Sequence, residues 1–386
     1  MKNKRIIRPE NIHKLYAGST ELSPFHCFYA NKKTVLRICA GRFFPHYNGE
    51  NVTDAYWSLR RNAALFDVPE RPIEISGPDS IRFLDFMFTR NVEKLKSGRG
   101  LYVLACTQDG GIFMDGILFK LSKDRFWFVQ PDGDMLTWLL AYKSNYNIQL
   151  SDPKSRALQI QGPTSFKILH EASNGTITEQ FKYFDSGFFK IGGQTVYVSR
   201  TGWTGELGYE IYTLKGQTNY QLLWQYLFKI GEDYGMTFSS MQAMNIRRIE
   251  AGIFDSGSDF DINTSPHEMG LEKFIDFKKK KFLGKQTLNK INKHKTITGI
   301  MSGAVVPARG EIVCQGETEI GQVTTGAYSP FFESGIGYLK LDRDLPPTGE
   351  ELRMLSHTAG PTTCKSVDLP FYDRNKTLAR SLVKQH

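Results

Sequence analysis

Alternation of apolar and polar residues predicts antiparallel strands through much of the first half of the chain. The runs GLYVLACTQ, IFMDGILFKLS and RFWFVQP follow one another after residue 99, and FFKIGGQTVYVSRTG and GYEIYTL follow after residue 187. Turn dipeptides at Gly110-Gly111 and Gly192-Gly193 interrupt this period-two pattern. Alternation broken by such turns is typical of hairpins. We therefore expect sheets built from antiparallel hairpins.

Spacing of apolar residues near 3.6 predicts helices at 52–65, 80–88, 164–172 and 218–234, the last ending at Gly235 as a C-terminal cap would. From about residue 295 the pattern changes to short strands between turn residues, in TITGIMSG, EIVCQGETEIGQVTTGAYSP, SGIGYLKL and EELRMLS. Short strands at regular spacing indicate an all-β module. The chain is therefore predicted to contain an α+β body and a β-rich, barrel-like C-terminal domain.

One short unit occurs twice in the chain. ISGPDSIRFL at 75–84 and IQGPTSFKIL at 160–169 match in residue type at almost every position. In each, an apolar strand ends at Gly-Pro, and Asp79 or Thr164 with the following serine supplies acceptors for the first helical turn. A duplicated strand, Gly-Pro and helix unit predicts an α+β core built from two related halves.

These patterns set the expected domain limits. Residues 1–290 are assigned to the α+β body, with two related sub-domains, the second inserted at about 70–150. Residues 291–376 are assigned to the β-rich domain and 377–386 to a polar tail. Several domains are expected because single hydrophobic cores stop growing at about 250–300 residues.

Composition narrows the class of protein. Charged residues make up 23% of the chain, and no apolar run approaches the roughly 18 residues of a spanning helix, so no membrane partner is expected. The basic N-terminus lacks the apolar core of a secretory signal. The five cysteines form no C-x-x-C pair, which suits buried thiols in a reducing compartment. A cytoplasmic protein without disulfides or a zinc site is therefore expected.

The chain carries a formal charge of +9, which suits either nucleic acid or an anionic small partner. Its densest basic run, 278–281, has only Phe277 and Phe282 beside it, and no RNP-like motif is present. No nucleic-acid partner is therefore expected. The positive charge suits a polyanionic cofactor tail as well as a plain solvated surface.

The stretch SRTGWTGELGYE at 199–210 is the densest group of glycines, aromatics and acids. Its glycine spacing is neither G-x-G-x-x-G nor a Walker loop, and Glu206 and Glu210 would repel phosphate. Ionised carboxylates instead accept hydrogen bonds, including two parallel N–H bonds from one ligand edge. Two interpretations stay open for this stretch alone: a hairpin with exposed acids, or a loop that binds a ligand rich in N–H groups.

Two other segments carry acids that could take part in metal or acid–base chemistry. DSGSDFDIN at 255–263 lacks the glycine and glutamate of a calcium loop, and no H-x-x-x-H or G-x-S-x-G motif is present, so no metal is expected. Asp115 interrupts an apolar strand directly after Gly110-Gly111. Its carboxylate either faces solvent on an alternating strand or enters a pocket where burial would raise its pKa.

In order along nearly the full chain, these segments resemble the aminomethyltransferase family of the glycine cleavage T-protein and its tetrahydrofolate-dependent demethylase relatives. The segments that carry the resemblance are LFDV, ISGPDS, LYVLACTQDGGIFMDGI, IQGP, SRTGWTGELGYE, RRIEAG, NTSPHEMGL, FLGK and PFY. The resemblance implies a three-domain ring around a central folate channel. In that ring the two Gly-Pro units belong to two related α+β domains, and the third domain is the β-rich one.

The resemblance also implies roles for individual residues. Glu210 corresponds to the family's pterin-holding glutamate, and Asp115 to its catalytic aspartate near N5 and N10 of tetrahydrofolate. The other folate-binding residues that it implies are Tyr102, Gln130, Tyr183, Trp203 and Arg374. Among these, the aromatic residues line the channel, Gln130 stands where the family has a pterin-contacting asparagine, and Arg374 is placed toward the glutamate tail.

The chain departs from the T-protein pattern at two places. Pro69-Glu70-Arg71-Pro72 replaces Ser-His-Met-Gly, and Met244 replaces an arginine. The strand region 123–139 looks more like the dimethylsulfoniopropionate demethylase branch. The function expected is therefore transfer of a methyl group from a small sulfonium, amine or methoxy donor to N5 of tetrahydrofolate, without a metal.

Trp203, Phe44 and Tyr47 are expected to give that donor a cation-π surface. For Phe44 and Tyr47, in the run RFFPHY, plain core packing is the open alternative. Two further functions also stay open: an aminomethyltransferase of glycine cleavage, which needs a lipoylated carrier protein, and a non-catalytic folate-binding protein. The absence of K-G-C-Y-x-G-Q argues against the iron-sulfur assembly relatives.

Overall fold

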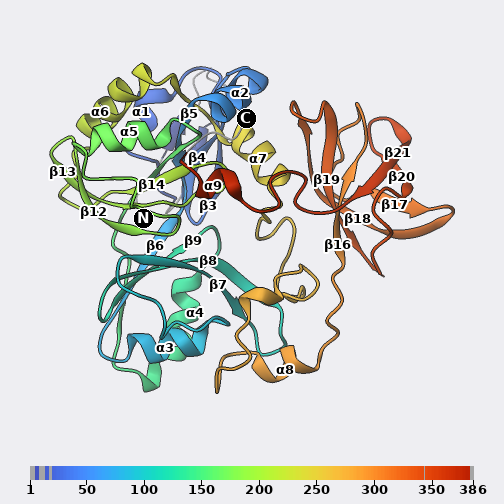
Figure 1. Ribbon diagram of the computed structural model, residues 1–386, viewed down its shortest axis with the longest axis horizontal. Helices are drawn as coiled ribbons and strands as arrows, with labels where there is room; N and C mark the ends of the chain where they lie inside the picture. The colour runs from blue at the N-terminus through green and yellow to red at the C-terminus, as the bar shows by residue number, and fades with distance from the viewer. Residues whose placement is uncertain (1–4, 8–13, 17–19, 343, 383–386) are drawn as a thin grey trace.

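The computed structural model describes residues 5–7, 14–16, 20–342 and 344–382. Figure 1 shows two sheets packed against each other on the left, a barrel on the right, and the short helix α9 (Thr377–Arg380) between them. Two small ribbons precede these units, β1 (Arg5–Ile7) with β2 (Lys14–Tyr16), and β3 (Val35–Cys39) with β4 (Arg42–Tyr47). Helix α1 (His26–Tyr29) lies between these ribbons in the chain. The α+β class is confirmed.

A six-stranded sheet has the order β12-β13-β14-β11-β5-β15, antiparallel except for the parallel pair β5 and β15. Its strands are β5 (Ala63–Val68), β11 (Ala157–Gln161), β12 (Ser186–Ile191), β13 (Gln194–Ser199), β14 (Gly208–Tyr212) and β15 (Met236–Phe238). Helices α5 (Ser165–Ala172) and α6 (Tyr220–Asp233) cover one face. Because side chains alternate along each strand, the other face is free to meet a second sheet.

The second sheet is fully antiparallel, in the order β10-β6-β9-β8-β7. Its strands are β6 (Arg71–Ser76), β7 (Arg99–Cys106), β8 (Ile112–Ser122), β9 (Arg125–Gln130) and β10 (Gln149–Ser151). Helices α3 (Ser80–Met87) and α4 (Met135–Tyr142), with a 3-10 turn at Lys143–Asn145, pack on its outer face.

The two sheets meet through large aromatic side chains. Trp127 on β9 lies with its ring centroid 5.2 Å from that of Tyr197 on β13. Phe119 on β8 meets Tyr212 on β14 at 6.1 Å in an edge-to-face contact. Helices α2 (Val52–Arg61) and α7 (Met241–Glu250) contribute to the same buried cluster. Side chains that point from either sheet into this layer are therefore held by packing on both sides.

The barrel is closed and antiparallel, in the order β16-β19-β18-β17-β20-β21. Its strands are β16 (Ile297–Met301), β17 (Ile312–Gln315), β18 (Thr318–Ser329), β19 (Ser334–Leu341), β20 (Glu351–Ser356) and β21 (Gly360–Val367). A 3-10 turn at Glu272–Phe274 and helix α8 (Lys285–Lys290) precede it. The predicted β-rich C-terminal domain is confirmed, whereas the exact domain limits stay predictions.

Both Gly-Pro units fold as predicted, β6 leading into α3 and β11 into α5. Gly77 and Gly162 have φ angles of 125° and 123°. A Cβ would lie 2.6 Å from the Asn147 carbonyl oxygen at the first position and 2.5 Å from that of Asn62 at the second. Glycine is therefore required by both conformation and space.

The helix acceptors predicted in these units are wrong in detail. Neither Asp79 nor Thr164 makes a side-chain cap bond. The Asp79 carboxylate instead accepts from the Asn147 backbone N–H at 2.8 Å, and the Thr164 hydroxyl donates to the Tyr234 carbonyl at 3.2 Å. Each side chain therefore connects its Gly-Pro unit to a distant segment of the chain.

The helix predicted at 52–65 is too long. Helix α2 ends at Arg61, and after Asn62 the chain enters β5, every residue of which is buried. A buried central strand has no polar alternation, so its apolar run looks like a continued helix.

The helix predicted at 218–234 is present as α6. It begins after Asn219, whose side chain accepts a hydrogen bond from the Leu222 backbone N–H.

The lysine run 278–281 is not uniformly solvated. Lys279 is buried, and its ammonium donates to the carbonyl oxygens of Phe88 at 2.7 Å and Arg90 at 2.9 Å, and also to that of Asp85. These carbonyls lie in the last turn of α3 or just after it, where a cation is favourable.

Among the described residues, no helix is both long and apolar enough to cross a membrane.

Candidate functional site

Glu210 lies on β14, on the sheet face that meets the second sheet, and is 7% exposed. Gln159 donates to its Oε1 at 3.0 Å. Its Oε2 accepts from the hydroxyls of Thr201 and Tyr212, each at 2.6 Å, and from that of Ser199 at 3.3 Å. Burial raises the pKa of Glu210, and the hydroxyl donors oppose that rise. The carboxylate is thus fixed through Oε2, while Oε1 has room for a second donor.

A second carboxyl group shares the same glutamine. The Gln159 amide nitrogen also donates to Glu70 Oε1 at 3.0 Å. Gln159 is 1% exposed, yet its own Oε1, like Glu70 Oε2, is buried without a hydrogen-bond partner. Burial raises the pKa of Glu70 to about 8, and the charge of Glu210 adds to that rise. Unpaired buried acceptors cost about 1–3 kcal/mol each, so this site suits a ligand that brings N–H groups.

Asp115 lies on β8 opposite Leu104 of β7, and is half-buried. The Tyr102 hydroxyl donates to its Oδ2 at 2.8 Å. Burial raises the pKa of Asp115 to about 6, the hydrogen bond from Tyr102 lowers it, and the charge of Asp255 raises it. The structure thus brings together Tyr102 and Asp115, two of the predicted site residues. The Asp115 carboxyl group changes protonation near pH 6.

The stretch SRTGWTGELGYE is not a hairpin with exposed acids, because Glu206 and Glu210 are both buried. Its glycines allow close packing: a Cβ on Gly205, where φ is 72°, would lie 2.6 Å from the Ala251 Cβ. A pocket opens beside it. The residues that line this pocket are Tyr183, Gly202, Gly205, Glu206, Arg247, Ala251, Ile253, Tyr372, Asp373, Lys376 and Ala379.

Tyr183 and Trp203 have contrasting surroundings. Tyr183 lines the pocket, and burial, with a contribution from the Glu210 charge, raises its pKa to about 12. Trp203 is half-buried, and the Arg248 guanidinium lies 5.4 Å from its ring centroid. One cation of the protein therefore already lies over the ring that was predicted to contact the donor.

Gln130 is buried, and both ends of its amide are engaged. Its nitrogen donates to the Gly133 carbonyl at 3.0 Å, and its oxygen accepts from the Met135 N–H at 3.0 Å. The side chain thus fixes the turn that leads into α4. Its contact with a pterin stays a prediction.

Phe44 and Tyr47 are half-buried on β4, the inner strand of a hairpin that packs against β5 and α7. The Arg374 side chain is 63% exposed and lies 3.4 Å from Asp368. Within the described part of the chain, no hydrogen bond or ion pair joins these three residues to either Asp115 or Glu210. Their roles in donor and folate binding stay predictions.

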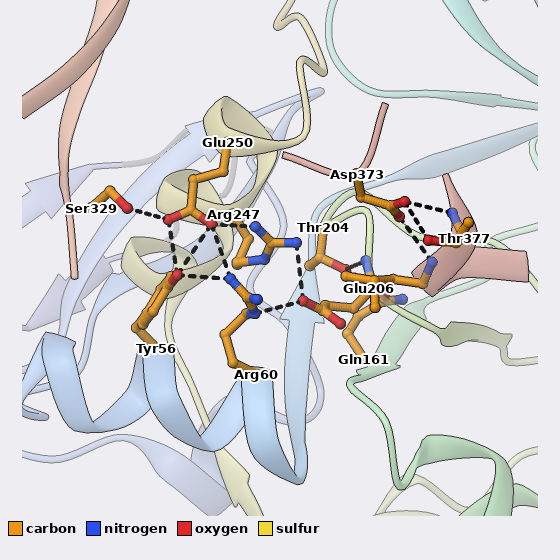
Figure 2. Close-up of polar contacts among 11 residues, drawn as sticks. Tyr56, Arg60, Gln161, Thr204, Glu206, Arg247, Glu250, Ser329, Asp373 and Thr377 are labelled. Carbon is orange, nitrogen blue, oxygen red and sulfur yellow. Dashed lines mark hydrogen bonds and ion pairs between the residues drawn. The ribbon is translucent and has the colours of Figure 1, made fainter. Parts of the chain in front are cut away.

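A buried ionic network, shown in Figure 2, adjoins the pocket through Glu206 and Arg247 and was not predicted. Glu206 Oε1 lies 3.0 Å from Arg60 Nε and 3.0 Å from Arg247 Nη2. Arg60 belongs to α2, Arg247 to α7 and Glu206 to the loop before β14. Three separate segments therefore meet at one carboxylate.

Glu250 completes the network from the last turn of α7. Its carboxylate accepts from the Tyr56 hydroxyl at 2.9 and 3.1 Å, from the Ser329 hydroxyl at 2.5 Å, and from Arg247. Ser329 lies at the end of β18, so the network connects the barrel to α2 and α7 (Figure 2). The RRIEAG motif places Arg247 and Glu250 three residues apart on one helix, a signal that could have revealed this pair.

Replacing Glu250 by alanine is expected to lower the free energy of unfolding by about 3–5 kcal/mol, because Arg247 and Arg60, whose Nη1 lies 3.5 Å from Glu250 Oε2, would both lose a buried partner. Chemical denaturation measures this difference. Glu317→Ala is the matched control, since that side chain is 94% exposed and its contact with Arg353 is worth about 1 kcal/mol at most. Equal, small effects of both variants would contradict a structural role for the network.

The C-terminal segment forms one wall of the pocket. The Asp373 carboxylate accepts from the backbone N–H groups of Thr377 and Leu378 and so caps α9. At the other end, the Arg200 guanidinium donates to the carbonyls of Ala379 at 3.3 Å and Arg380 at 2.8 Å. Part of the segment that was assigned to a polar tail thus forms helix α9, of which Ala379 is buried and lines the pocket.

Comparison with known proteins gives a consistent picture. Residues 32–279 match the GCVT N-terminal domain, and residues 295–373 match the glycine cleavage T-protein C-terminal barrel domain. Two aminomethyltransferases are similar in sequence. That of Caldanaerobacter subterraneus subsp. tengcongensis is 30% identical over 89% of this chain and 96% of its own length. That of Halothermothrix orenii is 32% identical over 83% of this chain and 91% of its own length.

A solved structure resembles the whole fold. The glycine cleavage system aminomethyltransferase T from Bartonella henselae superposes with a TM-score of 0.81 over 92% of this chain and 99% of its own. The sequences are 22% identical, so this likeness concerns the fold alone. It includes the arrangement of two packed sheets and a C-terminal barrel.

Proposed function

The chain belongs to the glycine cleavage T-protein family, and from that premise we propose that it transfers a one-carbon group to tetrahydrofolate, the acceptor that the family uses. The observation that carries this proposal is the acceptor-rich site around Glu210. A reduced pterin presents a 2-amino group and a ring N–H along one edge. The open lone pair of Glu210 Oε1 and the unpaired Gln159 Oε1 fit that edge.

When bound, tetrahydrofolate supplies N5 as a nucleophile. In the proposed mechanism Glu210 orients the ring, and Asp115 lies near the reacting centre. Because the pKa of Asp115 is about 6, its carboxyl group is ionised at neutral pH. A fixed negative charge in a partly desolvated site stabilises the positive charge that develops on the donor or on N5 as the carbon moves. Tyr102 keeps that carboxylate in position through its hydroxyl.

The donor with the better support is an aminomethyl group on a lipoyl-bearing carrier protein. Two relatives, 30% and 32% identical, are named aminomethyltransferases. In that reaction the carbon passes from the carrier's sulfur to tetrahydrofolate, ammonia leaves, and the carrier keeps a dihydrolipoyl group. This ranking reverses the order expected from the sequence, which favoured a demethylase.

A methyl group from a small methylated donor is the second candidate. It is favoured by the two departures from the T-protein pattern, residues 69–72 in place of Ser-His-Met-Gly and Met244 in place of an arginine. The cation-π surface proposed for this donor has less support, since Arg248 already lies over Trp203.

Product analysis by mass spectrometry tests these proposals. The protein is mixed with tetrahydrofolate and either an aminomethyl-loaded lipoyl carrier or a panel of methylated sulfonium, amine and methoxy compounds. Methylene-tetrahydrofolate with ammonia supports the first donor, and 5-methyl-tetrahydrofolate supports the second. Binding of tetrahydrofolate without either product would indicate a non-catalytic folate-binding protein. Absence of binding would contradict the proposed function itself.

A further inference from the structure

Glu70, Gln159 and Glu210 form a row in which one amide group holds two carboxyl groups apart. Gln159 on β11 lies opposite Glu210 of β14, and Glu70 lies between β5 and β6. The amide nitrogen has two N–H bonds, and each is directed to one carboxyl group at 3.0 Å. In a planar amide these two bonds diverge by about 120°, which places the accepting oxygens about 5 Å apart.

The row is held from behind by buried contacts. The Arg42 guanidinium is buried and donates to the Glu70 carbonyl at 2.7 Å and to the Ser155 carbonyl at 2.8 Å. Glu210 is fixed through its other oxygen by three hydroxyl groups. The positions of both carboxyl groups are therefore set before any ligand binds, which reduces the entropy lost on binding.

Two acceptors in this row have no donor. Glu70 Oε2 and Gln159 Oε1 are buried and unpaired, and Glu210 Oε1 has a single donor. An exocyclic amino group on an aromatic ring has the same planar pair of N–H bonds as the Gln159 amide. Such a group could therefore lie between the same two carboxyl groups from the opposite side.

We propose that Glu70 and Gln159 extend the Glu210 site into a binding row for the exocyclic 2-amino group of the pterin, with Glu70 accepting the N–H that Glu210 does not. This inference rests on the proposed function and names the part of the ligand that these two residues recognise. A sulfonium or quaternary ammonium donor has no N–H to offer and would leave both Glu70 Oε2 and Gln159 Oε1 unpaired. The row therefore selects a ligand edge with several N–H donors.

The protonation of Glu70 gives an independent signature. Burial and the charges of Glu210 and Asp67 raise the pKa of Glu70 to about 8, and the charge of Arg42 opposes that rise. The nearby Cys39 thiol also titrates, and its own pKa is raised mainly by burial. Glu70 is thus mostly protonated at pH 7 in the free protein. A ligand that needs an acceptor here releases that proton. Affinity should therefore rise as the pH rises through about 8.

Equilibrium binding of two ligands tests the inference. Tetrahydrofolate and its 2-desamino analogue are titrated into the wild-type protein, Glu70→Gln and Gln159→Leu, with the exposed Glu179→Gln as control. In Glu70→Gln the introduced amide nitrogen would face the ligand's amino group. We expect both site variants to lose at least about tenfold in affinity for tetrahydrofolate, the value of one hydrogen bond to a charged group. The affinity of Glu70→Gln for the analogue should be unchanged, because the analogue lacks the group that Glu70 is proposed to bind.

The outcomes separate the inference from the proposed function. If wild-type protein binds tetrahydrofolate but Glu70→Gln keeps both its preference over the analogue and its pH dependence, the inference is wrong and the proposed function stands. If wild-type protein binds neither ligand, both are wrong. Should Glu70→Gln fail to fold, Glu70→Asp keeps the charge but shortens the side chain, and it must still reduce the preference for the 2-amino group.

Discussion

Replacing Asp115 by asparagine is expected to lower kcat by about 10²- to 10³-fold, the usual effect of removing one preorganised electrostatic group. Affinity for tetrahydrofolate should change little, because Asp115 is assigned to the reacting centre. In the wild-type protein, kcat/KM should fall about tenfold per pH unit below about 6, where the carboxylate becomes protonated. The variant should lack this acid limb. Initial rates from pH 5 to 8, with the donor identified by product analysis, measure both effects.

Two further variants serve as controls for this prediction. Asp109→Asn changes an exposed carboxylate in the turn before the same strand and should leave the rate unchanged. Tyr102→Phe removes the hydrogen bond that lowers the pKa of Asp115, so its acid limb should move to higher pH. An Asp115→Asn variant with a wild-type rate and pH profile would show that this carboxylate has no part in the transfer.

Replacing Glu210 by glutamine is expected to weaken tetrahydrofolate binding by about 10²-fold or more. The change removes the charge from a buried acceptor whose hydrogen bonds to the ligand are worth about 1.5–3 kcal/mol each. Calorimetry on the free protein measures the loss, and KM for tetrahydrofolate should rise in parallel.

A graded variant tests whether orientation of this carboxylate matters. Thr201→Val removes one of the hydroxyl donors that fix Glu210 Oε2, at 2.6 Å, but leaves the charge in place. Its affinity should fall by less than that of Glu210→Gln. If Glu210→Gln binds tetrahydrofolate as tightly as the wild-type protein, Glu210 does not hold the pterin.

Local patterns in the sequence were sufficient for much of the fold. Period-two alternation and Gly-Gly turns located the hairpins, because each signal lies within a few residues of the structure that it specifies. The repeated Gly-Pro units predicted two strand-to-helix connections, which Gly77 and Gly162 make with nearly equal φ angles. Asp115 and Glu210 were placed as site candidates by motif order, a signal that packing does not obscure.

What could not be predicted depends on distant partners or on unusual burial. Gln159 meets carboxyl groups 89 residues before it and 51 residues after it, and alternation indicates only the face on which each lies. Helix α7 was missed because Arg247 and Arg248 are both buried. Charged residues inside the protein remove the amphipathic pattern by which a helix is recognised, and only their ion pairs make that burial tolerable.

The wall formed by residues 372–379 has a consequence for the order of events during synthesis. These residues are translated after both sheets and the barrel, yet they line the pocket beside Glu206 and Tyr183. Arg200, translated some 180 residues earlier, reaches its carbonyl partners only when this segment has emerged from the ribosome. On the nascent chain the pocket thus lacks one wall until residues 372–379 have been made, although the other residues around it are already present.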